Sequence, residues 1–163
     1  MSQKKNLYLL CGCPASGKST WVKSQKPGVW CSRDQVRFMM VKEDEEYFSR
    51  EDEVFNHWIY CINRAIENET GPKNIYVDAT HISQKSRNKV LNKLYLDKVN
   101  IIAVDFNTPL KECLRRNAKR PGRECVPPDV LRQMYNNYQP PTFNEKYKYM
   151  GIIHVGKRGE NNG

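Results

Sequence analysis

An α/β fold, in which helices cover both faces of a parallel sheet, is predicted by two features of this 163-residue sequence. Short apolar runs alternate along the chain with helix-like stretches, as they do in repeated strand–helix–strand units. The chain also has the length of one domain, and 39% of its residues are hydrophobic, which is enough for one core. We therefore expect a single domain over residues 1–156 and a disordered tail at 157–163, where the sequence reads KRGENNG.

The predicted elements follow one another in a regular order. The apolar runs predict strands at residues 7–11, 28–31, 74–78, 99–106 and 151–155. Helices are expected from residue 18 and over residues 33–41, 49–69, 83–96 and 109–120. The helix at 49–69 has the clearest apolar stripe, formed by Val54, Trp58, Cys61, Ile62, Ala65 and Ile66. We expect Ser49 with Asp52 to cap its start and Gly71-Pro72 to end it.

Prolines mark the starts of two later helices. Thr108-Pro109 opens the helix at 109–120, and Pro127-Pro128 opens another. Between them lies KRPGRECV, a basic loop with a proline and a glycine, so we expect residues 115–128 to form a basic, mobile helical lid. After Tyr138 the sequence QPPTFNEKYKY predicts a linker before the last strand.

The composition narrows the classes of partner and compartment. Lys and Arg number 27 against 18 Asp and Glu, a formal net charge of +9, which favours a polyanionic partner, although many solvated surfaces are basic too. The six cysteines form no Cys-x-x-Cys pair, so we expect reduced thiols rather than a zinc site or disulfides. No apolar run approaches the roughly 18–20 residues of a membrane helix, and no signal-peptide pattern precedes the first strand. We expect a soluble cytoplasmic protein.

The stretch GCPASGKST, between the first predicted strand and the first predicted helix, has the P-loop pattern G-x-x-x-x-G-K-[ST]. Its glycines let successive backbone N–H groups point at phosphate oxygens, and the following helix adds its positive end. We expect Lys18 to reach the β- and γ-phosphates of ATP and Ser19 to bind Mg²⁺. The residues predicted to line the nucleotide are Gly12, Pro14, Ala15, Ser16, Gly17, Lys18, Ser19 and Thr20.

Two charged residues follow the second strand. Asp34 and Arg37 stand three apart at the start of a helix, at the ligand-binding edge of an open α/β sheet. The aspartate is placed to accept a proton from an attacking hydroxyl, and the arginine to anchor an anionic group of the acceptor. The alternative is that Asp34 caps the helix and Arg37 is its surface ion-pair partner.

Further charges lie at strand ends and in the lid. Asp78 and Asp105 each close a strand, where they either help to hold Mg²⁺ or cap the next turn. The segment KECLRRNAKRPGREC carries six basic residues and a single acid before its last glutamate, and arginines that arrive with a lid neutralise charge on a transferring phosphoryl group. Most of these basic side chains are expected to be simply solvated.

These segments together resemble the kinase domain of the phage 5′-hydroxyl polynucleotide kinase family. The stretches that carry the resemblance, in the family's order and over residues 7–138, are GCPASGKSTW, SRDQVR, VDATHIS and RRNAKRPGRECVPPDVLRQMY. The resemblance implies a P-loop kinase-like three-layer fold and transfer of the ATP γ-phosphate to the 5′-hydroxyl of DNA or RNA in nucleic-acid repair. It implies Asp34 as general base and Arg37 as the residue that holds the acceptor's 3′-side phosphate.

The same resemblance assigns four further positions. Arg116 and Arg120 are implied to be lid arginines on the donor phosphates, with Arg120 catalytic alongside Lys18. Thr80 is implied to lie beside the acceptor, and Val126 to pack on its base. His81 stands where relatives commonly have Asn and is expected to be an ordinary loop histidine. The sequence stops before the phosphatase domain of some members, so phosphatase and ligase partners are expected to be separate proteins.

Other functions stay open from the sequence. The same fold phosphorylates nucleosides, tRNA-linked hydroxyls or small metabolites, and a non-kinase NTPase switch or motor is a further alternative. The sequence shows no consecutive acidic pair after an apolar strand and no Asn-Lys-x-Asp stretch, which disfavours motors and many GTPases. A purely nucleic-acid-binding module would leave the P-loop unexplained. DNA or RNA preference and oligomeric state are not predicted.

Overall fold

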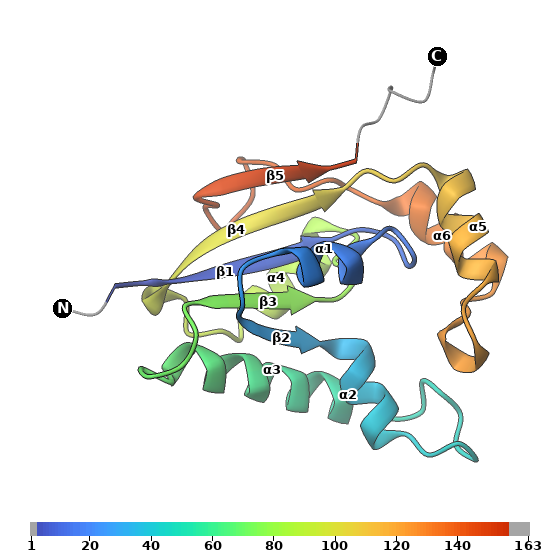
Figure 1. Cartoon of the computed structure of the whole chain (residues 1–163), viewed down its shortest axis with the longest axis horizontal. Coiled ribbons are helices and arrows are strands. Elements are labelled where there is room, and N and C mark those ends of the chain that lie inside the picture. Colours follow the sequence, from blue (N-terminus) through green and yellow to red (C-terminus); the bar gives the residue numbers. More distant parts are fainter. Residues whose placement is uncertain (1–2, 157–163) are drawn as a thin grey trace.

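The computed structural model describes residues 3–156, and its centre is a five-stranded parallel sheet in the order β2-β3-β1-β4-β5 (Figure 1). Every neighbouring pair of strands is parallel. The strands are β1 (Lys5–Cys11), β2 (Val29–Ser32), β3 (Asn74–Asp78), β4 (Val99–Phe106) and β5 (Gly151–Val155). The predicted parallel α/β fold is therefore confirmed, and β1 lies at its centre.

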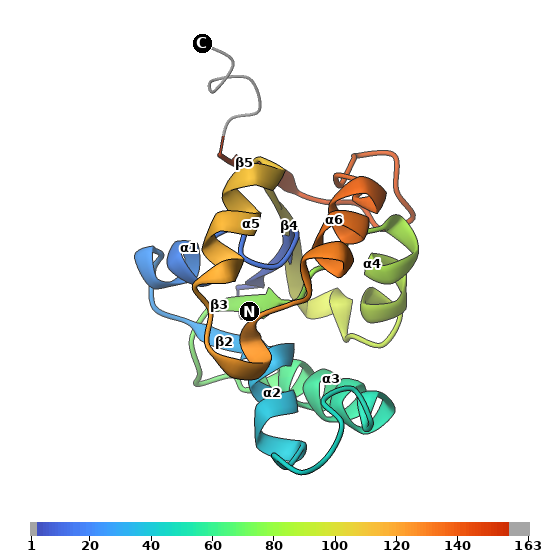
Figure 2. The ribbon, with the colours of Figure 1, turned by 90° about the vertical axis from the view of Figure 1, so that its right-hand side faces the viewer.

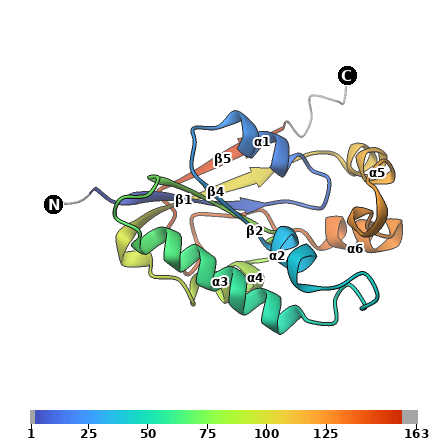
Figure 3. The ribbon, with the colours of Figure 1, turned by 60° about the horizontal axis from the view of Figure 1, so that its bottom comes forward.

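Helices lie on both faces of this sheet. α1 lies on one face, and α3 and α4 lie on the other (Figure 3). The α-helices are α1 (Lys18–Ser24), α2 (Arg33–Met40), α3 (Glu51–Glu67), α4 (Gln84–Leu91), α5 (Leu110–Ala118) and α6 (Pro128–Asn137). Two 3₁₀ turns, η1 (Leu96–Lys98) and η2 (Gly122–Glu124), complete the described elements.

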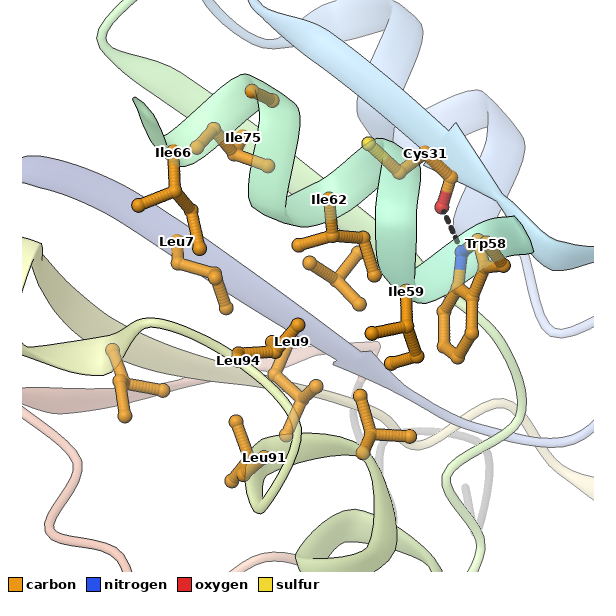
Figure 4. Packing of buried hydrophobic residues seen from close by; sticks show 14 of the residues in the cluster. Leu7, Leu9, Cys31, Trp58, Ile59, Ile62, Ile66, Ile75, Leu91 and Leu94 are labelled. Carbon is orange, nitrogen blue, oxygen red and sulfur yellow. Dashed lines mark hydrogen bonds between the residues drawn. The ribbon is translucent and has the colours of Figure 1, made fainter. Parts of the chain in front are cut away.

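The larger core fills the space between the sheet and α3. Trp58 on α3 is fully buried, and its Nε1 donates a hydrogen bond of 2.9 Å to the Cys31 carbonyl of β2 (Figure 4). Leu7 and Leu9 of β1 face the same layer. The opposite face has a smaller, aromatic core, in which Trp21 of α1 meets the rings of Tyr8, Tyr76 and Phe106 edge-on. The apolar stripe predicted for residues 49–69 is the surface that holds α3 on the sheet.

The strand register brings chain ends together on one edge. Leu10 of β1 pairs with Asp78 of β3, and Cys11 pairs with Asp105 of β4. All five strands point toward the side of the molecule where α2, α5 and α6 lie (Figure 1). Loops that follow the strands therefore meet at this edge, where open α/β sheets bind their ligands.

The bounds of α3 and α4 differ from the prediction. α3 begins after Arg50 without a side-chain cap, and the Ser49 hydroxyl donates to the Glu46 carbonyl, so the predicted capping by Ser49 and Asp52 is wrong. α3 ends at Glu67, before the predicted Gly71-Pro72 stop. α4 begins with a capping box between Ser83 and Ser86 but ends at Leu91, because a turn and η1 follow it.

The remaining structural expectations stand as follows. The predicted tail at 157–163 lies outside the described residues, and the single domain over 1–156 stays a prediction. Within residues 3–156, no helix combines the length and the apolar character that crossing a membrane requires. No cysteine of the described residues forms a disulfide.

Candidate active site

The loop between β1 and α1 has the shape that phosphate binding requires. A Cβ on Gly12 would lie 2.8 Å from both the Phe106 Cβ and the Ser16 Oγ, so only glycine fits there. Ala15 and Gly17 have positive φ angles of 62° and 103°, which curl the backbone between them. The buried Ser16 hydroxyl oxygen has no hydrogen-bond partner among the described residues. The loop is a cradle of backbone groups with room for an anion.

Neighbouring loops hold this cradle in place. The Gly12 N–H donates to the Thr80 carbonyl over 2.9 Å, which ties the cradle to the segment after β3. On the other side, the Thr108 hydroxyl donates to the Ser16 carbonyl over 2.6 Å, which ties it to the start of α5. The predicted neighbour of the acceptor, Thr80, is therefore joined to the donor loop through its backbone.

Lys18 curls back over the cradle. Its Nζ donates to the carbonyl oxygens of Gly12 and Cys13 over 2.8 and 2.9 Å. Burial lowers the pKa of Lys18, the charges of Asp78 and Asp34 oppose that fall, and the charge of Arg120 adds to it. The charges of Asp78, Asp34 and Arg120, from three other segments of the chain, therefore act on Lys18.

Asp78 is the last residue of β3, the strand between β1 and β2. Its side chain is buried, and its Oδ2 accepts a 2.9 Å hydrogen bond from the Trp30 Nε1. Burial raises the pKa of Asp78, and the nearby Lys18 charge opposes the rise. Asp78 is therefore a candidate to help hold a bound cation, which is one of the two roles that the sequence left open for it.

Asp34 and Arg37 lie on α2, which directly follows β2. The Arg37 Nη1 donates to the Asp34 Oδ1 over 2.5 Å, and its Nε and Nη2 donate to the two Glu51 oxygens over 2.6 and 2.9 Å. The Asp34 side chain is 61% exposed, whereas that of Arg37 is only 7% exposed. The cap of α2 is Ser32, not Asp34, and Arg37 is no surface residue. Of the alternative interpretation, the Asp34–Arg37 ion pair is confirmed. Its two other parts, Asp34 as the cap of α2 and Arg37 as a surface residue, are wrong.

Glu51 was not singled out from the sequence. It stands at the first turn of α3 and clamps Arg37 from the side opposite to Asp34. Burial alone raises the pKa of Glu51, but hydrogen bonds and charge from Arg37 bring it below its usual value. Burial alone lowers the pKa of Arg37, and its bonds to Glu51 raise it overall. The pair stays ionised and fixes the guanidinium beside Asp34.

The lid continues from α5 through η2 to α6 and lies across from α2 (Figure 2). Arg116 pairs with Glu112 over 2.9 Å, and its Nη1 lies 3.2 Å from the position of a Cβ on Gly17. Within residues 3–156, Arg120 forms no ion pair, so its charge is available to an anion. The lid thus brings Arg116 to the phosphate cradle and sets Arg120 close enough to influence Lys18.

Val126 lies at the base of the lid. The buried Asn117 side chain accepts from its N–H over 3.0 Å and donates to its carbonyl over 2.6 Å. The half-buried Val126 side chain packs against the small apolar cluster of Cys13, Cys113 and Leu131. A contact between Val126 and the acceptor base stays a prediction.

His81 differs from an ordinary loop histidine because it is buried and has a positive φ. His81 is buried, has a φ of 44°, stacks on Trp58, and its Nδ1 lies 2.5 Å from the Leu10 carbonyl. Burial lowers the pKa of His81 to about 3, so it is neutral.

On the far side of β1, the Tyr138 hydroxyl and the His154 Nδ1 hold the two oxygens of buried Asp105 at 2.5 and 2.9 Å. Asp105 is thus a partnered carboxyl rather than a free metal ligand.

A family model for the AAA domain matches residues 7–141, which is most of the chain. The chain belongs to the AAA domain family. Among the described residues of this AAA domain, no three His, Cys, Asp or Glu side chains gather to hold a metal ion by themselves.

Solved structures share the fold of this AAA domain. The structure of the Pnkp1/Rnl/Hen1 RNA repair complex contains a chain with a TM-score of 0.70 and 21% identity, covering 90% of this chain and 51% of that one. Chaetomium thermophilum Kti12 in complex with ADP-AlF3 gives 0.63 at 14% identity, covering 91% and 88%. A gluconokinase from Sinorhizobium meliloti 1021 gives 0.55 at 12% identity, covering 96% and 86%. The AAA domain therefore has a P-loop kinase-like fold and spans about half of the repair-complex chains that it matches.

Proposed function

We propose that this protein transfers the γ-phosphate of ATP to the 5′-hydroxyl end of DNA or RNA. The observation that carries the proposal is the strand register, in which Leu10 of β1 and Ser32 of β2 both lie beside Asp78 of β3. The donor loop with Lys18 and the start of α2 with Asp34 therefore leave the sheet at one edge, and the Arg116 Nη1 of the lid lies 3.2 Å from the position of a Cβ on Gly17. An NTPase switch has no use for an exposed carboxylate held in place by a clamped arginine.

The chemistry follows from these positions. Asp34 accepts the proton of the acceptor hydroxyl, whose oxygen then bonds to the γ-phosphorus as the bond to the β–γ bridging oxygen breaks and ADP leaves. Lys18, Arg116 and Arg120 neutralise the charge that builds on the phosphoryl oxygens. Arg37 has five N–H groups: three bond to carboxylates, and the side chain also has a hydrogen bond with Tyr47, so at least one N–H is left, which is proposed to bind the phosphate on the 3′ side of the acceptor nucleoside.

The site fits Mg²⁺ in the manner of P-loop enzymes. Ser19 is exposed at the first turn of α1, and Asp78 is the last residue of β3, the strand next to β1. Both offer hard oxygen atoms, and Mg²⁺ keeps several waters and takes further oxygens from substrate phosphates. We propose that Ser19 holds the ion and that Asp78 orders its waters; the bound ion supplies charge neutralisation on the phosphates.

The test is a transfer assay with γ-labelled ATP and Mg²⁺. The acceptors are matched 5′-hydroxyl RNA and DNA oligonucleotides, a nucleoside 3′-phosphate and gluconate, since the gluconokinase match extends over 86% of that chain. We expect label on the oligonucleotides. Label on gluconate alone assigns a small-molecule kinase, and phosphate release without any labelled acceptor assigns an NTPase. The RNA repair match also motivates a search for separate phosphatase and ligase partners.

Asp34→Asn tests the base. We expect a loss of about 10²- to 10⁴-fold in kcat with ATP binding retained. Asp129→Asn is the matched control, because Asp129 also pairs with an arginine three residues on, at 3.2 Å, on the exposed start of α6. Transfer at the wild-type rate by the Asp34 variant excludes it as the base.

A further inference from the structure

An aromatic cluster at the end of α2 and in the connection to α3 has no role in the proposed phosphoryl transfer. Phe38, Tyr47 and Phe48 form it: the rings of Phe38 and Tyr47 lie 5.5 Å apart, and those of Tyr47 and Phe48 meet edge-on at 4.9 Å. This connection projects past the carboxyl ends of the strands, next to α2 (Figure 1). The aromatic cluster therefore borders the side of the site that we assign to the acceptor.

Two arginines pack on this aromatic cluster. The Arg37 guanidinium lies over Tyr47 and Phe48, with 5.2 and 5.1 Å to the ring centroids. The Arg123 guanidinium of the lid lies over Phe38 and Tyr47, at 5.4 and 5.2 Å. Arg123 also donates to the Val41 and Lys42 carbonyls over 3.2 to 3.4 Å. The lid is thereby attached to the aromatic cluster, and both sides of the cluster are held in place.

Phe48 is the exposed member of the cluster. It is 58% exposed, although its ring is supported by Arg37 and by the edge contact with Tyr47. The exposed, flat and apolar ring of Phe48, held by these two contacts, is suited to stacking on another flat ring.

The charges in the connection between α2 and α3 determine which groups can stack on Phe48. Residues 43–46 read EDEE, so four consecutive carboxylates lie directly before Tyr47 and repel a phosphate. An uncharged planar group is not repelled. The nucleobase of a single strand has this chemistry, and its phosphate is drawn instead to Arg37 on the other side of Phe48.

We propose that Phe48 is the stacking site for the base of the second nucleotide of a single-stranded acceptor. The inference rests on the proposed function, which gives Arg37 the phosphate after the first nucleoside. Because the Arg37 guanidinium packs directly on the Phe48 ring, the base that comes next along the strand reaches that ring. The enzyme then prefers an oligonucleotide to a nucleoside 3′-phosphate or a sugar, since only the oligonucleotide has a second base.

The experiment compares two 5′-hydroxyl hexanucleotides, one intact and one abasic at the second nucleotide. Fluorescence anisotropy gives Kd, and the transfer assay gives KM. We expect Phe48→Ala to weaken binding of the intact hexamer about 5- to 150-fold, because base–aromatic stacking is worth roughly 1–3 kcal/mol. The abasic hexamer binds wild-type protein with the same loss, and Phe48→Ala then adds nothing further. KM for a nucleoside 3′-phosphate, which has no second base, rises by a smaller factor than Kd for the intact hexamer.

Two variants separate stacking from folding. Phe48→Trp keeps a flat ring and retains the affinity for the intact hexamer. Tyr60→Ala removes another aromatic side chain, also 58% exposed, from the outer face of α3, and leaves both hexamers unaffected.

Each remaining outcome overturns the proposal in a recognisable way. Equal Kd values of wild type and Phe48→Ala for the intact hexamer overturn the stacking site while transfer to 5′ ends still supports the proposed function. An equal loss for intact and abasic hexamers assigns Phe48 a structural role in the loop. A chain that binds neither hexamer overturns both proposals together.

Discussion

At the scale of single residues, the site depends on how one arginine is held. Arg37 is almost fully buried between Asp34 and Glu51, and a buried guanidinium without its carboxylates is costly. The spacing of Asp34 and Arg37 on one helix predicted their pairing. Glu51 escaped prediction because it follows a connection without periodicity, and contacts between residues so distant in sequence leave no local pattern.

Glu51→Gln removes one of the two charges that hold Arg37. We expect a loss of about 2 kcal/mol in the free energy of unfolding and a fall of about tenfold in kcat/KM, because Asp34 is then less firmly oriented. Urea denaturation and the transfer assay measure the two effects. Glu53→Gln, two residues further along α3 and paired with half-buried Arg50, is expected to change the free energy of unfolding much less, because the Glu53 side chain is 58% exposed. Equal effects of the two substitutions contradict a special role for Glu51.

His81 makes stability depend on pH. Its pKa is about 3 in the folded chain and about 6.5 when unfolded, so the unfolded chain binds the extra proton between these values. The stabilising contribution is complete above pH 6.5 and is lost progressively as pH falls toward 3. Between pH 7 and pH 5 this costs about 2 kcal/mol.

His81→Asn removes that dependence. Asn tolerates the positive φ of 44°, so the variant is expected to fold and to lose about 2 kcal/mol less than wild type between pH 7 and pH 5. Urea denaturation at the two pH values measures this, and His57→Asn on the exposed face of α3 serves as control. A variant as acid-sensitive as wild type shows that another group is responsible.

At the scale of elements, the predictable parts were those with a local signature. The P-loop, the strand ends and the proline start of α6 follow from residues adjacent in sequence, and the structure places them as expected. The start of α3 was not predictable, because its N-cap is Arg50, whose side chain makes no capping hydrogen bond and so leaves no local signature. The lid was predicted as a basic loop, but its anchors, Asn117 and Arg123, bind backbone groups that no sequence pattern identifies.

Asn117→Ala releases the base of the lid. Two backbone groups of Val126 lose their partners, and we expect the free energy of unfolding to fall by about 2–3 kcal/mol. Trypsin is expected to cut after Arg123 faster in this variant, which limited proteolysis measures. Asn136→Ala, at an exposed position on α6, gives the wild-type pattern. Unchanged cleavage and stability contradict an anchoring role.

At the scale of the whole molecule, one buried ion pair joins α4 to the segment that leads into β5. Arg87 and Glu145 meet through two hydrogen bonds of 2.8 and 2.9 Å, and their side chains are 1% and 3% exposed. Arg87 also donates to the His81 and Gln139 carbonyls. The predicted linker after Tyr138 is therefore fixed to the body, a result that its proline-bearing sequence did not predict.

Glu145→Gln leaves the Arg87 charge buried without its counter-charge. We expect a loss of about 3–5 kcal/mol in the free energy of unfolding, measured by urea denaturation. Replacing the pair together, as Arg87→Met with Glu145→Leu, is expected to restore part of that loss. Lys146→Gln at the neighbouring exposed position controls for the substitution. A Glu145 variant as stable as wild type contradicts the anchoring role.

The central place of β1 has a consequence for how the chain is made. β1 precedes the other described strands in synthesis, yet Asn6 pairs with Asn74 and Lys5 pairs with Val99. Its partners on both sides emerge from the ribosome only later, so the nascent chain holds an apolar strand without neighbours while most of the domain is still being translated. Loop closure over such separations is slow, and folding on the ribosome must wait for β4. The phosphate cradle at the end of β1 thus acquires its shape only after β4 has been made.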